Sequence, residues 1–166
     1  KFYGVNTTVI HNYPDVQMLP IAPRIRRNEN MLVYVGGISK QRGAFEMVGA
    51  LENLDTSYHV RLELIGRFEP NNLGAMLEKS PGYQHVRFIG WLNHEKVHEH
   101  LQKALIGLVC LHPEPRYVVS LPVKLFEYMA AGLPVIASNF PLWKDIIETN
   151  HCGLTVDPLN PKEISE

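Results

Sequence analysis

Short apolar runs and amphipathic segments alternate along the chain from Met31 onward. The apolar runs predict buried strands, at residues 31–37, 58–66, 85–91, 105–112, 133–138 and 152–156. Between them, apolar residues that recur every three or four positions predict helices, at residues 43–54, 69–80, 93–104, 122–132 and 141–150. Strict alternation of strand and helix is typical of parallel sheets with helices on both faces. We therefore predict an α/β fold, a Rossmann-like three-layer, doubly wound parallel sheet of about six strands.

The chain divides into three parts. Residues 1–30 are weakly periodic, contain three prolines and end in the basic stretch "PRIRRNEN", which predicts a linker or strap. Residues 31–160 hold the predicted Rossmann-like domain. Residues 161–166 begin with "PKEI", which looks like the opening turn of a truncated helix. Because the chain also starts at Lys1 without a methionine, we expect a piece of a longer protein.

The composition is that of a globular domain with a full-sized core. The chain has 166 residues, of which 45% are hydrophobic and 20% are charged. Its apolar runs are all shorter than a transmembrane helix requires. The formal net charge of -1 provides no overall field for nucleic acid or anionic lipid, so we predict no nucleic-acid partner.

The cysteines and histidines indicate neither a disulfide framework nor a metal site. Cys110 lies inside an apolar run and Cys152 lies in a distant turn, which fits a reducing, cytoplasmic environment. His94 and His98 stand four residues apart on a predicted helix, which is the spacing of a metal-ligand pair. Because no cysteine, aspartate or third histidine joins them at ligand spacing, we interpret this stretch as a solvated helix face.

The first predicted strand leads into a glycine-rich turn. In "VGGISKQRG", Gly36 and Gly37 allow close approach of the backbone, and the next helix offers free N–H groups to an anion. Lys40 and Arg42 add positive charge. The residue order is neither that of a P-loop nor that of the dinucleotide motif G-x-G-x-x-G. The turn is therefore either a phosphate-binding loop in outline or a plain connection with solvated cations.

A second segment carries two charges at the start of an otherwise apolar helix. In "SLPVKLFEYMAAGLPVIAS", Lys124 and Glu127 share one edge of the helix, where they could form a surface ion pair of roughly a few tenths of a kcal/mol. A lysine in the first turn opposes the helix dipole, however, and a bound anion would compensate it. A carboxylate one turn later can accept two hydrogen bonds from a ribose. Tyr128 faces the opposite edge and is expected to pack.

Several segments together resemble a known enzyme family. "KLFEYMAAGLPVIAS", followed by "CGLTVDPLNPKEI", is similar to the C-terminal, donor-binding domain of GT-B glycosyltransferases of the retaining, family 4 or group 1 type. "VYVGGISKQRG" resembles the glycine-rich loop of that domain, and "VNTTVIHNYPDV" resembles the crossover between the two domains. The resemblance implies retaining transfer of a hexose from a UDP- or GDP-sugar to a glycan or lipid-linked acceptor, as in cell-surface polysaccharide synthesis.

The resemblance also implies how the donor diphosphate is held. In the family a basic pair in the glycine loop contacts the diphosphate. Arg42 matches the second cation of the pair, whereas Gly37 stands at the position of the first. Lys40 or Lys124 could supply the charge that is lost. Stabilisation of the leaving group is expected from Arg42 and Lys124, and the resemblance assigns no other catalytic residue in this domain.

Residues for the sugar, the ribose and the base follow from the same resemblance. Glu127 matches the glutamate that binds the ribose hydroxyls, while Val119 stands where the family often has a sugar-contacting glutamate. The loop and helix residues expected near the diphosphate and sugar are Gly36, Gly37, Lys40, Arg42, Ser120, Leu121, Pro122 and Lys124. The base is expected against backbone, with Trp91 or Phe68 as a wall. The residues assigned to it are Phe68, Gly90, Trp91 and Leu92.

The family resemblance has further consequences for cofactors and partners. It implies no cofactor and no metal, because cations and helix N-termini take the charge of the leaving group. It implies a missing N-terminal domain that binds the acceptor. For the whole protein it implies a cytoplasmic location with peripheral association at the inner face of the membrane. We expect the chain alone to bind nucleotide weakly and not to catalyse transfer.

Three other functions stay open at the level of sequence. A non-catalytic nucleotide-binding module fits the departures from the family at Gly37 and Val119. A sugar-nucleotide epimerase of the same architecture would need acid/base carboxylates and a histidine, which are not apparent in the motif segments. A flavodoxin-like receiver domain would need an acidic cluster at the strand ends, where this chain carries glycine, arginine, tryptophan and histidine.

Overall fold

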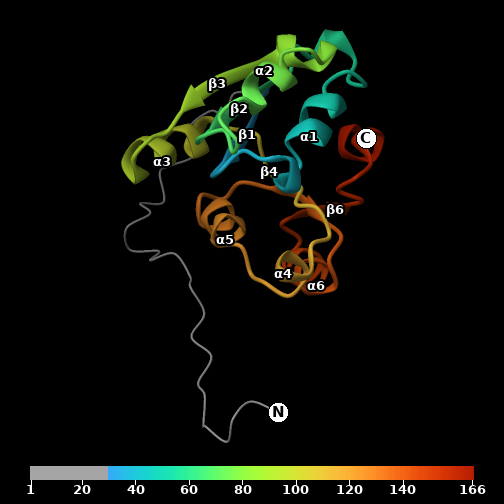
Figure 1. Cartoon of the computed structure of the whole chain (residues 1–166). Helices are drawn as coiled ribbons and strands as arrows, with labels where there is room; N and C mark the ends of the chain where they lie inside the picture. The colour runs from blue at the N-terminus through green and yellow to red at the C-terminus, as the bar shows by residue number, and fades with distance from the viewer. Residues whose placement is uncertain (1–29) are drawn as a thin grey trace, which may run out of the picture.

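A six-stranded sheet runs through the part of the chain that the computed structural model describes, residues 30–166 (Figure 1). Its strands are β1 (Met31–Val35), β2 (Arg61–Ile65), β3 (Val86–Gly90), β4 (Ile106–Val109), β5 (Val135–Ser138) and β6 (Gly153–Val156). All neighbouring strands pair in parallel. The predicted Rossmann-like parallel sheet is therefore confirmed. The linker predicted for residues 1–30 lies outside the described residues, apart from Asn30.

The strand order creates a crevice at the centre of the sheet. The order is β3-β2-β1-β4-β5-β6, so the chain first builds outward from β1 on one side and then returns to add β4 on the other. In open parallel sheets, ligands bind outside the carboxyl ends of the strands at this switch point. The loops that follow β1 and β4 are therefore the first places to look for a site.

Helices cover both faces of the sheet and produce two separate apolar cores. They are α1 (Ala44–Ala50), α2 (Leu73–Leu77), α3 (His94–Lys103), α4 (Pro115–Val118), α5 (Val123–Ala130), α6 (Pro141–Thr149) and α7 (Pro161–Ser165). Because side chains alternate along a strand, Val33 and Tyr34 of β1 enter opposite cores. The core around Val33 contains residues of α3, α5 and α6. The core around Tyr34 contains residues of α1, α2 and α7.

The predicted elements differ from the observed ones mainly at their ends. The segment between β4 and α5 was expected to be a long loop, but it contains the short helix α4. Pro115 starts that helix, where its missing N–H group costs nothing. The glycine-rich turn contains a short 3-10 helix, Lys40–Arg42, before α1 begins. The helix expected near residue 161 is α7, and its Ile164 is buried in the core beside α1 and α2.

The interpretation of a solvated helix face holds for His94, which is exposed, and is wrong for His98. His98 is buried, and its Nε2 atom lies 2.8 Å from the Nε2 atom of Gln102. His100 lies against the buried carboxylate of Glu63 on β2, which also pairs with Arg87 of β3 at 3.3 Å. His100 therefore joins α3 to the sheet. No cluster of three metal-binding side chains occurs within residues 30–166.

Neither a disulfide nor a membrane-spanning helix occurs in the described chain. Cys110 and Cys152 are both free thiols, and Cys110 is buried. Burial raises the pKa of the Cys110 thiol to about 12, so this side chain behaves as an inert core residue. None of the helices from Asn30 onward is both long and apolar enough to cross a bilayer.

Tyr128 attaches α5 to the end of β1. Its ring is fully buried and lies so close to Gly107 that a Cβ atom at that position would come within 2.4 Å of it. Its hydroxyl oxygen accepts a hydrogen bond from the backbone N–H of Val35 at 2.9 Å. Val35 is the last residue of β1, directly before the two glycines. The packing role expected for Tyr128 is therefore confirmed, and it fixes α5 relative to the glycine-rich turn.

Substitution Tyr128→Phe tests this attachment. The change keeps the buried ring but leaves the Val35 N–H without an acceptor, which costs roughly 1–3 kcal/mol of unfolding free energy. Urea denaturation monitored by circular dichroism measures the loss. The matched control is Tyr83→Phe at a partly buried site, with an expected change within about 0.5 kcal/mol. Equal effects of the two substitutions would contradict the proposed attachment.

Candidate functional site

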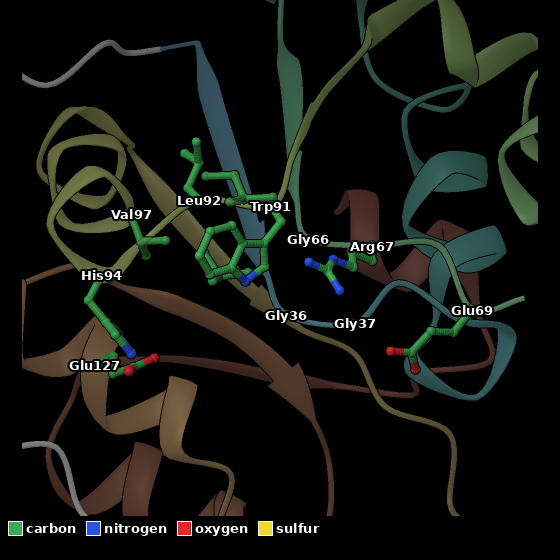
Figure 2. Close-up of a pocket in the computed structure, with 12 residues that line it drawn as sticks. Gly36, Gly37, Gly66, Arg67, Glu69, Trp91, Leu92, His94, Val97 and Glu127 are labelled. Atoms are coloured by element: carbon green, nitrogen blue, oxygen red, sulfur yellow. The ribbon is translucent and has the colours of Figure 1, made fainter. Parts of the chain in front are cut away.

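A cleft of about 440 Å³ opens at the carboxyl ends of β1 and β2 (Figure 2). It is bounded by the glycine-rich turn after β1, the loops after β2 and β3, the first turn of α3, and α5. This volume lies in the range of small-molecule binding sites. The cleft lies at the carboxyl ends of the strands, where parallel sheets bind ligands, but on the β2 and β3 side of β1, and the loop after β4 does not line it.

Two loops that form the floor of the cleft continue to pair beyond the strands. The N–H of Gly36 donates to the carbonyl of Ile65, and the N–H of Ile38 donates to the carbonyl of Arg67 at 2.8 Å. Gly36 has a φ of 122° and Gly66 a φ of 153°, and a Cβ atom on Gly66 would lie 1.8 Å from the carbonyl oxygen of Gly36. Glycine is required at these positions because of both φ and the close approach.

Lys124 brings a buried positive charge to the glycine-rich turn. Its Nζ atom is inaccessible to solvent, and no group in the described chain accepts a hydrogen bond from it. It lies 3.8 Å from the centroid of the Tyr34 ring, a cation–π contact. It also lies 3.1 Å from the point that a Cβ atom on Gly36 would occupy. The ammonium group therefore lies against the backbone of the turn, without a hydrogen-bond acceptor in residues 30–166.

This environment changes the protonation of Lys124. Burial, assisted by the charge of Arg42, lowers the pKa of Lys124 to about 7, although the carboxylate of Glu127 acts in the opposite direction. A buried ammonium group without a hydrogen-bond acceptor is costly. An anion that entered the cleft beside Gly36 would supply the missing acceptor. The site is therefore electrostatically prepared for an anionic group.

Arg42 approaches the same turn from its other end. Its Nη1 atom donates to the carbonyl oxygen of Gly37 at 3.4 Å, and the hydroxyl of Tyr34 donates to the same oxygen at 2.7 Å. Burial acts to lower the pKa of Arg42, but the phenols of Tyr117 and Tyr34 outweigh it, so the pKa is raised. The turn thus lies between the cations Arg42 and Lys124, neither of which lines the cleft itself.

Glu127 and the residues after β3 form one side of the cleft. Glu127, Trp91 and Leu92 all line it. The indole of Trp91 is 64% exposed, and the guanidinium of Arg67 lies 5.8 Å from its ring centroid. Gly90 contributes differently, because its carbonyl accepts a hydrogen bond from the N–H of Gly66 at 2.9 Å. The structure therefore brings Trp91, Leu92 and Glu127 together and uses Gly90 to join two loops.

Two residues assigned to the site from sequence lie elsewhere. Lys40 is exposed on the 3-10 helix and does not line the cleft. The ring of Phe68 stacks on Phe88, with centroids 4.4 Å apart, and packs against Gly74. Phe68 therefore anchors the loop after β2 and is not placed as a wall for the base.

The segment before α5 supports the helix and does not line the cleft. The hydroxyl of Ser120 donates to the carbonyl of Tyr117, and the indole of Trp143 donates to the carbonyl of Ser120 at 2.6 Å. Leu121 packs against the core, and Pro122 is the N-cap residue of α5. Val119 is 76% exposed. This segment positions Lys124 and Glu127 through the start of α5.

The structure adds two residues that sequence reasoning did not assign. Glu69, from the loop after β2, and His94, from the first turn of α3, both line the cleft. In Figure 2, Glu69 lies at the opposite end of the cleft from His94 and Glu127. The signal for Glu69 was its place after a strand, at an edge where ligands bind. His94 was interpreted only as a member of a histidine-rich helix face.

Comparison with known proteins identifies the family. The model described as glycosyl transferases group 1 matches residues 18–166. The chain belongs to this family. Its fold is that of the C-terminal domain of GT-B glycosyltransferases. The crystal structure of such a C-terminal domain, LpcC from Francisella tularensis, is similar with a TM-score of 0.73 at 21% identity, covering 92% of this chain and 84% of that one.

The curated relatives have low sequence identity to this chain and are longer than it is. The chain is 26% identical over 142 residues to the uncharacterized glycosyltransferase MJ1607 of Methanocaldococcus jannaschii, covering 85% of this chain and 35% of the relative. It is 26% identical over 145 residues to the lipopolysaccharide glucosyltransferase WaaG of Escherichia coli, covering 86% and 37%. The chain thus spans about a third of the length of the curated relatives it matches.

The buried charge of Lys124 predicts a specific dependence of stability on pH. The pKa of Lys124 is about 7 in the folded chain and 10.5 as a reference. Between these values the unfolded chain binds more protons, so the unfolding free energy rises with pH. Lys124→Met should be more stable than the wild type at pH 7. That advantage should shrink by roughly 3 kcal/mol by pH 9.5, at roughly 1.4 kcal/mol per pKa unit.

Urea denaturation of the wild type and of Lys124→Met at the two pH values measures this change in relative stability. Other groups that titrate at alkaline pH are present in both proteins, so their effects cancel. The matched control is Lys40→Met, which removes an exposed lysine of the same turn. Its stability relative to the wild type should be independent of pH. Parallel pH curves for the wild type and Lys124→Met would show that Lys124 titrates normally.

Proposed function

We propose that this chain is the donor-binding domain of a glycosyltransferase that uses a UDP- or GDP-sugar. The observation that carries the proposal is the buried Lys124 ammonium group, which has no hydrogen-bond acceptor within residues 30–166 and lies against Gly36, a residue that lines the cleft. Membership of the glycosyl transferases group 1 family supports the same reaction class. The structure of HepE from Anabaena in complex with UDP and glucose, with a TM-score of 0.63 at 18% identity, shares the fold.

The diphosphate is proposed to bind over the glycine pair. Lys124 and Arg42 reach Gly36 and Gly37 from different elements, so two cations can contact one diphosphate. Both are held before the ligand arrives, Lys124 by the Tyr34 ring and Arg42 by the Gly37 carbonyl. Fixed charges of this kind stabilise the negative charge that develops on a leaving diphosphate. We assign no metal or cofactor to this step.

The nucleoside is proposed to lie between α5 and the loop after β3. Glu127 is one turn beyond Lys124 on α5, so a ribose attached to a diphosphate at Gly36 can reach its carboxylate. The base then lies near Trp91 and Leu92. The exposed indole and the neighbouring Arg67 offer a stacking surface for either uracil or guanine.

The acceptor side of the reaction is proposed to belong to a second domain. The greater length of the relatives supports such a domain. One relative is named a lipopolysaccharide glucosyltransferase and another, from Candida glabrata, a chitobiosyldiphosphodolichol beta-mannosyltransferase. These names support a glycan or lipid-linked acceptor. A role in polysaccharide synthesis, with the enzyme in the cytoplasm and at the inner face of the membrane, is proposed from the family resemblance. Retention at the anomeric carbon is proposed from the family resemblance described above.

Nucleotide binding should be coupled to proton uptake at Lys124. At pH 8 a group with a pKa of about 7 is largely neutral, and a bound diphosphate favours its charged form. Isothermal titration of UDP and GDP in buffers of different ionisation enthalpy measures the uptake. Lys124→Met should abolish it and weaken binding about 10- to 100-fold, the effect of one charge-assisted contact. Lys40→Met should change neither quantity.

Two results would contradict the diphosphate site. One is that neither UDP nor GDP binds the chain at millimolar concentration. The other is that Lys124→Met binds the nucleotide as tightly as the wild type and with the same proton uptake. In the second case the nucleotide binds elsewhere on the molecule.

Glu127 should contribute to the affinity for the nucleoside and not to that for the diphosphate. Glu127→Gln is expected to weaken binding of UDP or GDP roughly 10-fold or more. It should leave inorganic pyrophosphate binding unchanged or slightly tighter, because a negative charge has been removed. A 2′-deoxy nucleotide should lose affinity for the wild type but not for the variant. Glu78→Gln, at an exposed site outside the cleft, is the control. Equal affinities of Glu127→Gln and the wild type for UDP and GDP would exclude the ribose role.

A further inference from the structure

Charges of opposite sign follow one another along the cleft. Glu127 and Glu69 lie at its two ends, with the glycine pair between them (Figure 2). Lys124 and Arg42 reach the glycine pair from α5 and from the end of the turn. Between the two carboxylates, Arg67 from the loop after β2 lines the cleft, and Lys124 and Arg42 lie against its glycine pair. A nucleotide-sugar presents the complementary order, in which the ribose hydroxyls and the sugar hydroxyls flank a diphosphate.

Glu69 fills the space that a side chain at position 37 would need. Its two carboxylate oxygens lie 2.9 and 3.0 Å from the point that a Cβ atom on Gly37 would occupy. The Nη1 atom of Arg42 lies 3.0 Å from the same point. The absence of a side chain at Gly37 thus allows a carboxylate from the next loop to reach the cleft directly beside the diphosphate position.

The backbone holds Glu69 in register with the glycine-rich turn. Its N–H donates to the carbonyl of Ile38 at 2.8 Å, and an isolated parallel bridge joins Ile38 to Phe68. The stacked rings of Phe68 and Phe88 fix the loop from the other side. The carboxylate is therefore presented from a fixed backbone, as a specific binding group requires.

The chemistry of Glu69 indicates what it binds. Across residues 30–166 no ion pair is formed by its carboxylate, so its oxygens are free to accept hydrogen bonds from a ligand. A carboxylate repels phosphate oxygens but accepts hydrogen bonds from hydroxyl groups. Position 119, where the family often has a sugar-contacting glutamate, offers no equivalent group, because Val119 is apolar and 76% exposed.

We propose that Glu69 is a donor-binding residue that accepts hydrogen bonds from hydroxyl groups of the transferred hexose and so helps to determine which sugar is held. This inference rests on the proposed function, since it places the diphosphate at Gly36 and Gly37. It assigns the two ends of the cleft to the two polyols of the donor, the ribose at Glu127 and the hexose at Glu69.

The test separates the sugar from the nucleotide. Dissociation constants of UDP, UDP-glucose, UDP-galactose, UDP-N-acetylglucosamine, GDP and GDP-mannose are measured by calorimetry for the wild type and for Glu69→Gln. With the sugar nucleotide that the wild type binds best, Glu69→Gln should lose about 10-fold in affinity. The parent nucleotide should bind the variant equally or more tightly, because a negative charge near the diphosphate has been removed.

Two further variants sharpen the result. Gly37→Ala places a Cβ atom about where the Glu69 carboxylate approaches, so it displaces the carboxylate without removing it. It should lower the preference for the sugar nucleotide over the parent nucleotide in the same direction as Glu69→Gln. Glu78→Gln removes an exposed carboxylate outside the cleft and should leave every constant unchanged. Unchanged urea unfolding curves confirm that Glu69→Gln is folded.

Each contrary outcome has a distinct meaning. If Glu69→Gln changes the affinities for nucleotide and sugar nucleotide by the same factor, Glu69 acts only through Arg42 and the inference is overturned. The inference is overturned as well if the wild type binds UDP or GDP with the same affinity as each of the corresponding sugar nucleotides. If the wild type binds none of the six compounds, the proposed function itself fails.

Discussion

The ammonium group of Lys124 is buried against the ring of Tyr34, and no group within residues 30–166 accepts its hydrogen bonds. Removing such a charge from water costs several kcal/mol, so the rest of the fold must stabilise the arrangement. Tyr128 does so by joining α5 to the end of β1, and Tyr34 does so by bonding the carbonyl of Gly37. The same contacts that keep the lysine in place also shape the glycine-rich turn. Stability and anion binding therefore oppose each other at this one side chain.

The layered fold could be predicted from local patterns because each element carries its own signal. The apolar runs of the strands and the spacing in α1, α3, α5 and α6 were sufficient for the sheet class. The ends of the strands and helices were harder to predict, since they depend on contacts between distant segments. No element was predicted between residues 112 and 122, yet Pro115 opens α4 there. His98 was interpreted as part of a solvated helix face, because sequence alone does not show that α3 packs against the sheet, where Glu63 of β2 contacts His100.

The site was predictable where one element carries the chemistry and not where loops meet. Arg42, Lys124 and Glu127 stand on the turn and helix that the sequence singled out. Glu127 lines the cleft, whereas Arg42 and Lys124 lie against its glycine pair without lining it. Glu69 depends on the pairing of the loops after β1 and β2, which no local pattern reveals. Phe68 was assigned to the site from sequence but lies outside it. An aromatic residue in a loop looks the same in the sequence whether its ring contacts a ligand or anchors the loop.

The account rests on one central claim, that the uncompensated charge at Lys124 is the receptor for the donor diphosphate. A crystal structure of the chain grown with UDP or GDP tests it most directly. The account predicts a phosphate oxygen within hydrogen-bond distance of the Lys124 Nζ atom, over Gly36 and Gly37, and the ribose hydroxyls on Glu127. A nucleotide bound at another surface, with Lys124 still buried against Tyr34 and without an acceptor, would contradict it.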